Sequence, residues 1–90
     1  MKVLEYYSLD FGNWRSAMAL IMYSIPGCGT CARAKHEMTE EGIDFEERNI
    51  NTNDQWYREA AKLAVTVPVF VHEDDRIEIG WRGDSGCLFQ

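Results

Sequence analysis

The sequence predicts a single α/β domain with a four-stranded mixed sheet. Two observations lead to this fold class. The chain has 90 residues, 46% of them hydrophobic, which is enough for one domain with a modest core. Its segments follow the order strand, helix, strand, helix, strand, strand, so the first strands should pair in parallel and the last two should form a hairpin.

The first 17 residues are interpreted as an N-terminal extension, and residues 18–90 as the domain. The extension carries seven large apolar side chains without a clear period, and Gly12 and Asn13 interrupt it. These apolar residues are Val3, Leu4, Tyr6, Tyr7, Leu9, Phe11 and Trp14.

The first strand and helix have clear limits in the sequence. Residues 19–23 form a nearly continuous apolar run, which is typical of a strand buried on both faces. Pro26 and Gly27 end this run. Residues 28–41 contain no proline and are rich in helix-favouring residues, and Gly42 is a suitable helix stop. We therefore expect a strand, a tight turn and a helix.

A second strand and helix follow directly. Residues 43–50 place Ile43 and Phe45 on one face and charged side chains on the other, as in a half-exposed strand. Residues 51–54 supply turn and N-cap residues. A helix over residues 54–64 then aligns an apolar face every three to four positions. Its members are Trp56, Ala60, Leu63 and Ala64.

The last two strands are expected to form an antiparallel hairpin. Residues 65–71 are rich in β-branched side chains, and an acidic turn occupies residues 73–75. Residues 76–81 follow, with Ile77 and Ile79 on one face.

Charge and apolar run length argue against nucleic-acid and membrane partners. The formal net charge is −6, and the nine lysine and arginine residues are scattered, which does not suit binding to a polyanion. No apolar run approaches the roughly 18 residues that a spanning helix needs. Without a secretory signal the cytoplasm is the expected location. There, three cysteines indicate redox or metal chemistry rather than a structural disulfide framework.

Cys28 and Cys31 are the candidate catalytic residues, because they lie where a buried strand gives way to a helix. Residues i and i+3 of a first helical turn lie about 5 Å apart, which a disulfide can bridge with little backbone movement. A thiol at a helix N-terminus meets free backbone N–H groups and the positive end of the helix dipole, which lower its pKa below about 8.5. Cys28 should therefore attack, and the more shielded Cys31 should resolve the mixed disulfide.

Two other interpretations of this cysteine pair are a zinc site and inert core packing. A zinc site would need further ligands, and the chain offers only Cys87, His36 and His72, with no second pair at zinc-finger spacing. Inert core packing conflicts with Pro26 and the glycines on both sides of Cys28, which indicate an irregular turn with an exposed side chain. Redox chemistry is therefore the leading interpretation, and no metal ligand is assigned.

Three segments together resemble the glutaredoxins, and most closely the glutaredoxin-like redoxins that donate electrons to ribonucleotide reductase. They are the CGTC segment at residues 28–31, the TVP segment at 66–68 and the GWRGD segment at 80–84, which is similar to the GFRPD segment of those redoxins. The resemblance covers about residues 20–85. It implies a thioredoxin-like fold and thiol-disulfide oxidoreductase activity.

The resemblance also implies a substrate-binding set beside the cysteines, comprising Thr66, Val67, Pro68, Trp81 and Asp84. The peptide bond before Pro68 should be cis, and the exposed Val67 backbone should pair with a peptide or glutathione. Trp81 could line the substrate groove or serve as a core or rim aromatic. Asp84 could receive a ligand's amino group or cap a final turn.

The chain departs from the family pattern in its site residues. Gly-Thr replaces the usual Pro-Tyr between the cysteines, and residues 23–27 contain no basic residue that could hold the glutathione carboxylate. Gly83 replaces a proline, which should loosen its turn. Arg82 is expected to pair with Asp84 or with a nearby carbonyl.

The C-terminal segment is the largest departure. Only six residues follow Asp84, so most of the family's final helix should be missing and some sheet surface left uncovered. The extension is expected to cover that surface or to form a dimer through it. Cys87 is either a small buried residue or an extra reactive thiol.

The predicted function is reduction of protein disulfides by the Cys28–Cys31 dithiol, without another cofactor. Thioredoxin reductase is the expected electron source, and glutathione is a possible co-substrate. The alternatives are a glutathione-dependent glutaredoxin and an iron-sulfur or metal carrier in which two chains share a cluster.

Overall fold

The computed structural model describes residues 20–90, so the predicted extension lies outside the described residues. The described elements follow one another in the expected order, with two further short strands. They are β3 (Leu20–Ser24), α1 (Gly29–Glu40), β4 (Phe45–Asn49), α2 (Asp54–Leu63), β5 (Thr66–Val67), β6 (Val69–Val71), β7 (Ile77–Ile79) and β8 (Cys87–Leu88).

The main sheet has four strands in the order β4-β3-β6-β7. Strands β3 and β4 are parallel because α1 carries the chain back across the sheet between them. Strands β6 and β7 pair with their neighbours in antiparallel fashion, and the acidic turn joins them as a hairpin. The mixed α/β, thioredoxin-like fold predicted from the sequence is therefore confirmed.

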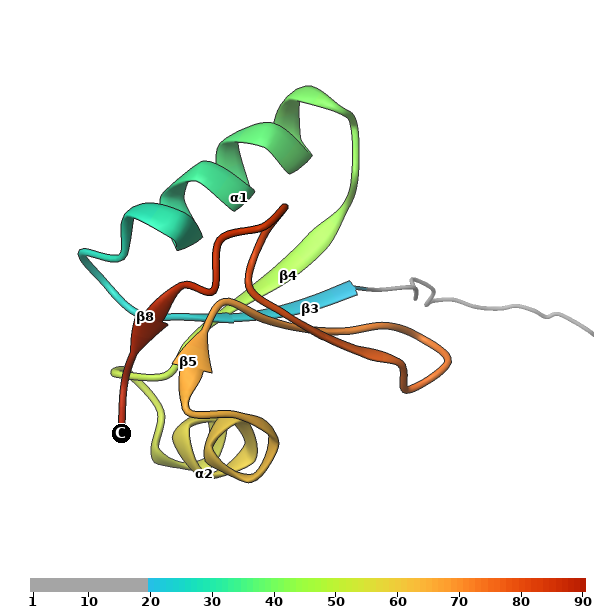
Figure 1. Ribbon diagram of the computed structural model, residues 1–90. Helices are drawn as coiled ribbons and strands as arrows, with labels where there is room; N and C mark the ends of the chain where they lie inside the picture. Colours follow the sequence, from blue (N-terminus) through green and yellow to red (C-terminus); the bar gives the residue numbers. More distant parts are fainter. Residues whose placement is uncertain (1–19) are drawn as a thin grey trace, which may run out of the picture.

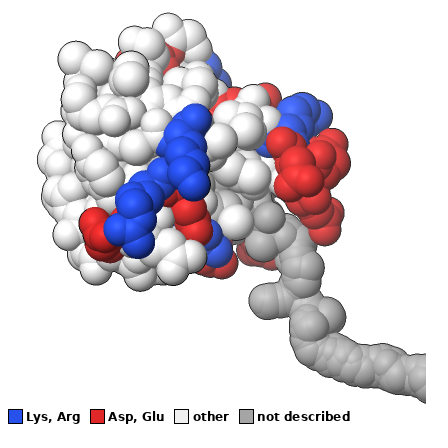
Figure 2. All heavy atoms as spheres, turned by 90° about the horizontal axis from the view of Figure 1, so that it is seen from below, with Lys and Arg blue, Asp and Glu red and all other residues white. Residues whose placement is uncertain are grey.

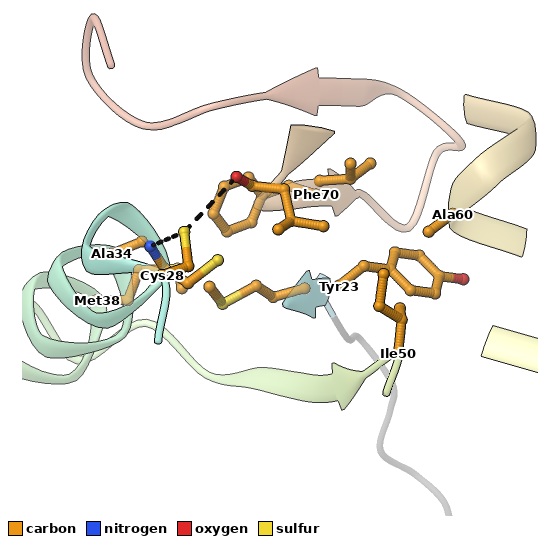
Figure 3. Packing of buried hydrophobic residues seen from close by; sticks show 11 residues of the cluster. Tyr23, Cys28, Ala34, Met38, Ile50, Ala60 and Phe70 are labelled. Atoms are coloured by element: carbon orange, nitrogen blue, oxygen red, sulfur yellow. Dashed lines mark hydrogen bonds between the residues drawn. The ribbon is translucent and has the colours of Figure 1, made fainter. Parts of the chain in front are cut away.

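The two helices lie on opposite faces of this sheet (Figure 1). Met22 and Phe70 are register partners and share one face, whereas Tyr23 and Val69 share the other. Figure 3 shows Met38 of α1 beside Cys28 and Ala60 of α2 near Tyr23. The core thus continues from one helix through the sheet to the other, and Cys28 lies at its edge.

The helix limits agree closely with the sequence pattern. The Asn53 side chain accepts a hydrogen bond from the Trp56 N–H at 3.1 Å and so caps the start of α2. Gly42 follows α1 with a φ of 74°, as expected for a glycine that stops a helix. Ile43 belongs to this stop and not to the second strand, because its N–H donates to the Met38 carbonyl at 2.9 Å.

The strand expected over residues 65–71 is divided in two at Pro68. Strand β5 pairs with β8 in a separate two-stranded sheet, whereas β6 belongs to the main sheet. Proline has no N–H for a ladder, so it marks the position where the chain passes from one sheet to the other.

The chain after Asp84 turns back towards β5 and forms a strand. Residues 85–90 contain no helix. Strand β8 pairs antiparallel with β5, placing Leu88 opposite Thr66 and Cys87 opposite Val67. The C-terminal segment therefore lies beside the segment that contains Pro68 (Figure 1).

Many of the charged side chains on the surface form ion pairs. On the face shown in Figure 2, basic side chains lie next to acidic ones. Arg48 contacts Glu46 at 2.6 Å and Glu59 at 3.2 Å, and Arg58 contacts Asp54. Within residues 20–90, neither helix is long and apolar enough to span a bilayer.

Candidate active site: the Cys28 and Cys31 thiols

Cys28 and Cys31 lie at the start of α1, as the sequence predicts. Strand β3 ends at Ser24, and Pro26 and Gly27 form an exposed turn in which Gly27 has a φ of 76°. Cys28 is the N-cap of α1, and Cys31 lies in its first turn. The turn thus delivers one thiol to the helix start and the other one turn inside.

Cys28 is buried, which corrects the expectation of an exposed side chain. It is 4% exposed, because its side chain packs against the segment that contains Val67. Its sulfur accepts a hydrogen bond from the Cys31 N–H at 3.4 Å and lies 3.9 Å from the Val67 carbonyl oxygen (Figure 3). Both the helix start and the Val67 segment therefore contact this thiol.

The surroundings of Cys28 favour its thiolate. Burial raises the pKa of Cys28, but hydrogen bonds from the Cys87 side chain, the Cys31 backbone and side chain and the Thr30 backbone outweigh burial and leave the pKa lowered. Donors at a helix N-terminus stabilise a negative sulfur in this way.

Cys31 has the opposite character. It is 1% exposed. Burial, followed by its hydrogen bond to Cys28, raises the pKa of Cys31 to about 12. A low-pKa thiol therefore adjoins a thiol that stays protonated, which suits the predicted roles of attacking and resolving cysteine.

The Val67–Pro68 peptide bond is cis, as the resemblance implies. Val67 and Pro68 are both buried, and the Val67 carbonyl faces Cys28. The backbone edge at Val67 is nevertheless occupied, since β8 pairs with β5 at this position. The expectation of a free Val67 backbone is wrong, because the C-terminal segment forms a strand there.

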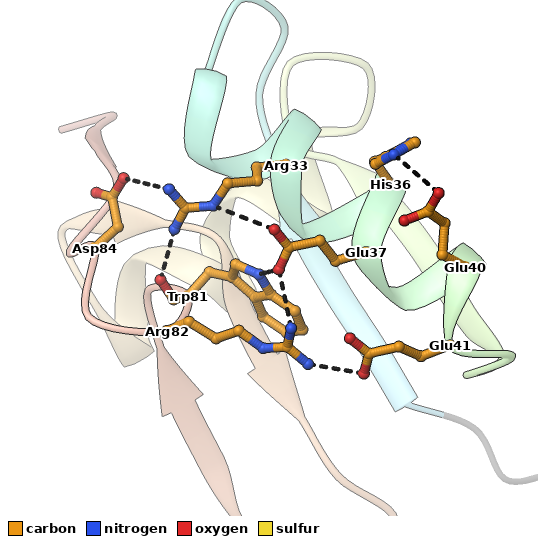
Figure 4. Close-up of polar contacts among 8 residues, drawn as sticks. All are labelled: Arg33, His36, Glu37, Glu40, Glu41, Trp81, Arg82 and Asp84. Carbon is orange, nitrogen blue, oxygen red and sulfur yellow. Dashed lines mark hydrogen bonds and ion pairs between the residues drawn. The ribbon is translucent and has the colours of Figure 1, made fainter.

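Trp81 and Arg82 connect the loop after β7 to α1 (Figure 4). The Trp81 indole N–H donates to Glu37 Oε1 at 2.7 Å, and its ring lies 5.5 Å from that of Phe70. Arg82 donates to Glu37 at 3.0 Å and to Glu41 at 2.7 Å. These two carboxylates are its partners in place of the expected Asp84 or nearby carbonyl. These contacts place Trp81 as a rim aromatic.

The turn containing Gly83 is closed and not loosened. Trp81 and Asp84 exchange backbone hydrogen bonds of 2.8 and 2.9 Å. Arg82 and Gly83, between them, have φ values of 45° and 88°. Two positive φ values are typical of a type I′ turn, and proline cannot adopt them because its ring fixes φ near −65°. The glycine therefore changes the shape of this segment relative to the redoxin pattern.

Asp84 is engaged within the chain. Its Oδ1 accepts the Gly86 N–H at 3.0 Å, and its Oδ2 lies 3.7 Å from the Arg33 guanidinium. The Gly86 N–H, followed by the Thr30 side chain, lowers the pKa of Asp84. Of the two readings, capping of the following turn describes these contacts.

Sequence reasoning missed the positions of Cys87 and Arg33. Cys87 is half-buried and lies opposite Val67, whose carbonyl faces Cys28, although sequence alone left its role open. Arg33 donates to the Trp81 carbonyl oxygen at 3.0 Å and lies 3.9 Å from Glu37. The i,i+4 spacing of Arg33 and Glu37 was a readable signal, whereas the sequence held no comparable signal for Cys87.

Comparison with known proteins identifies the family. The family model described as Glutaredoxin matches residues 20–77, which include Cys28, Cys31 and the TVP segment. This chain belongs to the glutaredoxin family. The chain is also 32% identical to the Gene 56 protein of Mycobacterium phage L5 over 84 residues, covering 90% of this chain and 82% of that protein.

Family membership supports a glutaredoxin-like redox function and, in general terms, thiol-disulfide oxidoreductase activity. Trp81, Asp84 and Cys87 lie beyond the matched residues. In the described part of the chain, no three His, Cys, Asp or Glu side chains are grouped so that they could hold a metal ion.

Proposed function

We propose that this glutaredoxin-family protein reduces protein disulfides with the Cys28–Cys31 dithiol. The observation that carries the proposal is the pairing of two unlike thiols at the start of α1. The pKa of Cys28 is lowered by hydrogen-bond donors, whereas burial raises that of Cys31 to about 12. One thiol is thus prepared to attack, and the other remains protonated until needed.

The proposed reaction has two exchange steps. The Cys28 thiolate attacks one sulfur of the substrate disulfide, and the other substrate sulfur leaves as a thiolate and takes up a proton. Cys31 then loses its proton and attacks the Cys28 sulfur, which releases the second substrate thiol and forms the Cys28–Cys31 disulfide. The substrate gains two electrons and two protons, and the protein loses the same number.

The GWRGD segment suggests which protein disulfide should be tried first. It resembles the corresponding segment of redoxins that serve ribonucleotide reductase, so this enzyme is the proposed physiological partner. A small disulfide-containing protein such as insulin provides a general substrate. Faster reduction of ribonucleotide reductase than of insulin would support the assignment, and equal rates would contradict it.

Thioredoxin reductase is the proposed electron source, because the chain lacks a basic residue before Cys28 that could bind the glutathione carboxylate. Residues 23–27 contain no basic residue, and nearby Arg33 is paired with Asp84 and Glu37. Loss of one charge-assisted contact costs about 1.5 to 3 kcal/mol, or roughly ten- to a hundredfold in affinity. A protein donor with a larger interface tolerates that loss better.

A paired assay separates the two electron sources. At equal protein concentration, NADPH with thioredoxin reductase should regenerate the dithiol faster than glutathione with glutathione reductase does. Efficient turnover with glutathione and none with thioredoxin reductase would make the protein a glutathione-dependent glutaredoxin.

A trapping experiment tests the two cysteine roles. Cys31→Ser should accumulate a mixed disulfide between Cys28 and the protein substrate, because the resolving thiol is missing. Cys28→Ser, its matched control, should trap nothing. A mixed disulfide that forms on Cys28→Ser as readily as on Cys31→Ser would contradict the assignment.

A further inference from the structure

The C-terminal strand lies on the backbone edge beside Pro68. Cys87 is directly opposite Val67, and Leu88 is opposite Thr66. The Phe89 N–H donates to the Val65 carbonyl at 3.1 Å. Hydrogen-bonded pairs alternate along an antiparallel ladder, so Val67 and Cys87 form the next pair of that same type. An incoming peptide could not use this edge while β8 remains there.

The position of β8 against β5 requires glycine at residue 86. Gly86 has a φ of 94°, and a Cβ there would collide with the Val67 carbonyl oxygen and lie 3.1 Å from Pro68 Cδ. Further along, the Phe89 ring packs edge-on against Tyr57 at 5.5 Å. The Gln90 amide donates to the Ala64 carbonyl at 2.9 Å. Contacts on both sides of Cys87 therefore fix its position.

The pairing of β8 with β5 places Cys87 close to Cys28, the proposed attacking thiol. Val67, the register partner of Cys87, carries the carbonyl that faces the Cys28 sulfur at 3.9 Å. Interaction with the Cys28 thiol raises the pKa of Cys87, as expected for a thiol beside a sulfur that carries negative charge. Cys87, nearly sixty residues after Cys28, is thus paired with the residue whose carbonyl faces the Cys28 sulfur.

We propose that residues 86–88 act as an internal occupant of the substrate edge and that Cys87 is a third redox residue, which forms a disulfide with Cys28. The proposal rests on the function proposed above, because it gives Cys28 the attacking role. A protein substrate that pairs with Val67 must then displace β8, whereas Cys87 can resolve a small mixed disulfide from its observed position.

The proposed exchange is balanced without another reactant. Cys28 attacks an external disulfide and releases one thiol, so that Cys28 carries a mixed disulfide. Cys87 loses its proton and attacks the Cys28 sulfur, and the second external thiol leaves and takes up a proton. The external disulfide gains two electrons. Cys31 can later attack Cys28 and release Cys87, which gives the Cys28–Cys31 disulfide without further oxidation.

Limited oxidation of Cys31→Ser tests the proposal with 5,5′-dithiobis(2-nitrobenzoate) as the probe. One equivalent should release two thionitrobenzoate anions per chain and leave a monomer with a Cys28–Cys87 disulfide and no adduct. The double variant Cys31→Ser/Cys87→Ser should release one anion and keep the adduct on Cys28. If Cys31→Ser also keeps its adduct, with Cys87 free, the proposal is overturned.

The double variant keeps this failure separate from failure of the proposed function. If it forms no adduct on Cys28, then Cys28 is not the reactive thiol, and both the proposed function and this inference are overturned.

A pair of glycine variants tests whether the pairing of β8 with β5 positions Cys87. In the Cys31→Ser background, Gly86→Ala should slow the second anion release at least about tenfold, because its Cβ collides with Val67. Gly83→Ala is the matched control, since it has a similar φ of 88° but no atom within 4 Å of the new Cβ. Equal release rates in the two variants would overturn the proposal.

Discussion

At the scale of single residues, the site shows how two neighbouring buried thiols acquire opposite chemistry. Cys28 and Cys31 are both almost fully buried, yet their pKa values move in opposite directions. The difference comes from position. The N-cap sulfur meets N–H and S–H donors, whereas the sulfur one turn inside meets mainly apolar surroundings and the charge of Cys28.

The pKa shifts predict the pH dependence of alkylation. Because the pKa of Cys28 lies below its ordinary value of 9.0, iodoacetamide modification of Cys28 should rise with pH and reach half of its maximum rate below pH 9.0. Cys31 should stay largely unmodified over this range, because its pKa is about 12. Pulsed alkylation followed by peptide mapping measures both rates. Modification of Cys31 before Cys28 would contradict the assignment.

Glu37 is predicted to stabilise the fold through the loop that follows β7. Glu37→Ala removes the acceptor for the Trp81 indole and for Arg82, and should lower the free energy of unfolding by about 1 to 2 kcal/mol. Glu40 lies about one helical turn after Glu37, and its contact with His36 is exposed. Glu40→Ala should therefore change the free energy of unfolding by less than about 0.5 kcal/mol. Urea unfolding of both variants decides, and equal losses would refute the claim.

At the scale of elements, hydrophobic period and turn residues were sufficient to predict both helices and the main sheet. Gly42 and Asn53 mark the helix limits by their own backbone or capping preferences, which are local properties. The two-residue strands β5 and β8 could not be predicted, because strands this short have no period and depend on their partner. The position of Cys87 opposite Val67 follows from that missed pairing.

The cap of α2 gives a prediction at this scale. Asn53→Ala removes the side-chain acceptor for the Trp56 N–H and should lower the free energy of unfolding by about 1 kcal/mol. Asn51→Ala, two residues earlier and outside the helix cap, is the matched control and should have a much smaller effect. Thermal or urea unfolding compares them. If Asn53→Ala leaves the free energy of unfolding unchanged, this cap contributes nothing to stability.

At the scale of the whole molecule, the candidate active site combines three distant parts of the chain. The helix start supplies Cys28 and Cys31, the segment at Pro68 supplies the Val67 carbonyl, and β8 supplies Cys87. The sequence placed the first two parts beside each other through their resemblance to glutaredoxins. The third could be placed only once the chain was folded.

The extension gives a prediction at this scale. Residues 1–17 are predicted to cover an apolar sheet face, and the edge strand β7 exposes Ile77 and Ile79 to 43% and 52%. Deleting residues 1–17 should therefore lower the melting temperature and increase binding of a hydrophobic dye. If melting, dye binding and oligomeric state all stay unchanged, the extension has no such role.

The central claim, that the Cys28–Cys31 dithiol supplies the electrons, is tested most directly by a single turnover. Reduced Cys87→Ser protein, which lacks the third thiol, is mixed with an equimolar protein disulfide, quenched with acid and mapped by mass spectrometry. The account predicts one Cys28–Cys31 disulfide for each substrate disulfide reduced. Reduction of the substrate while both cysteines remain thiols would contradict it.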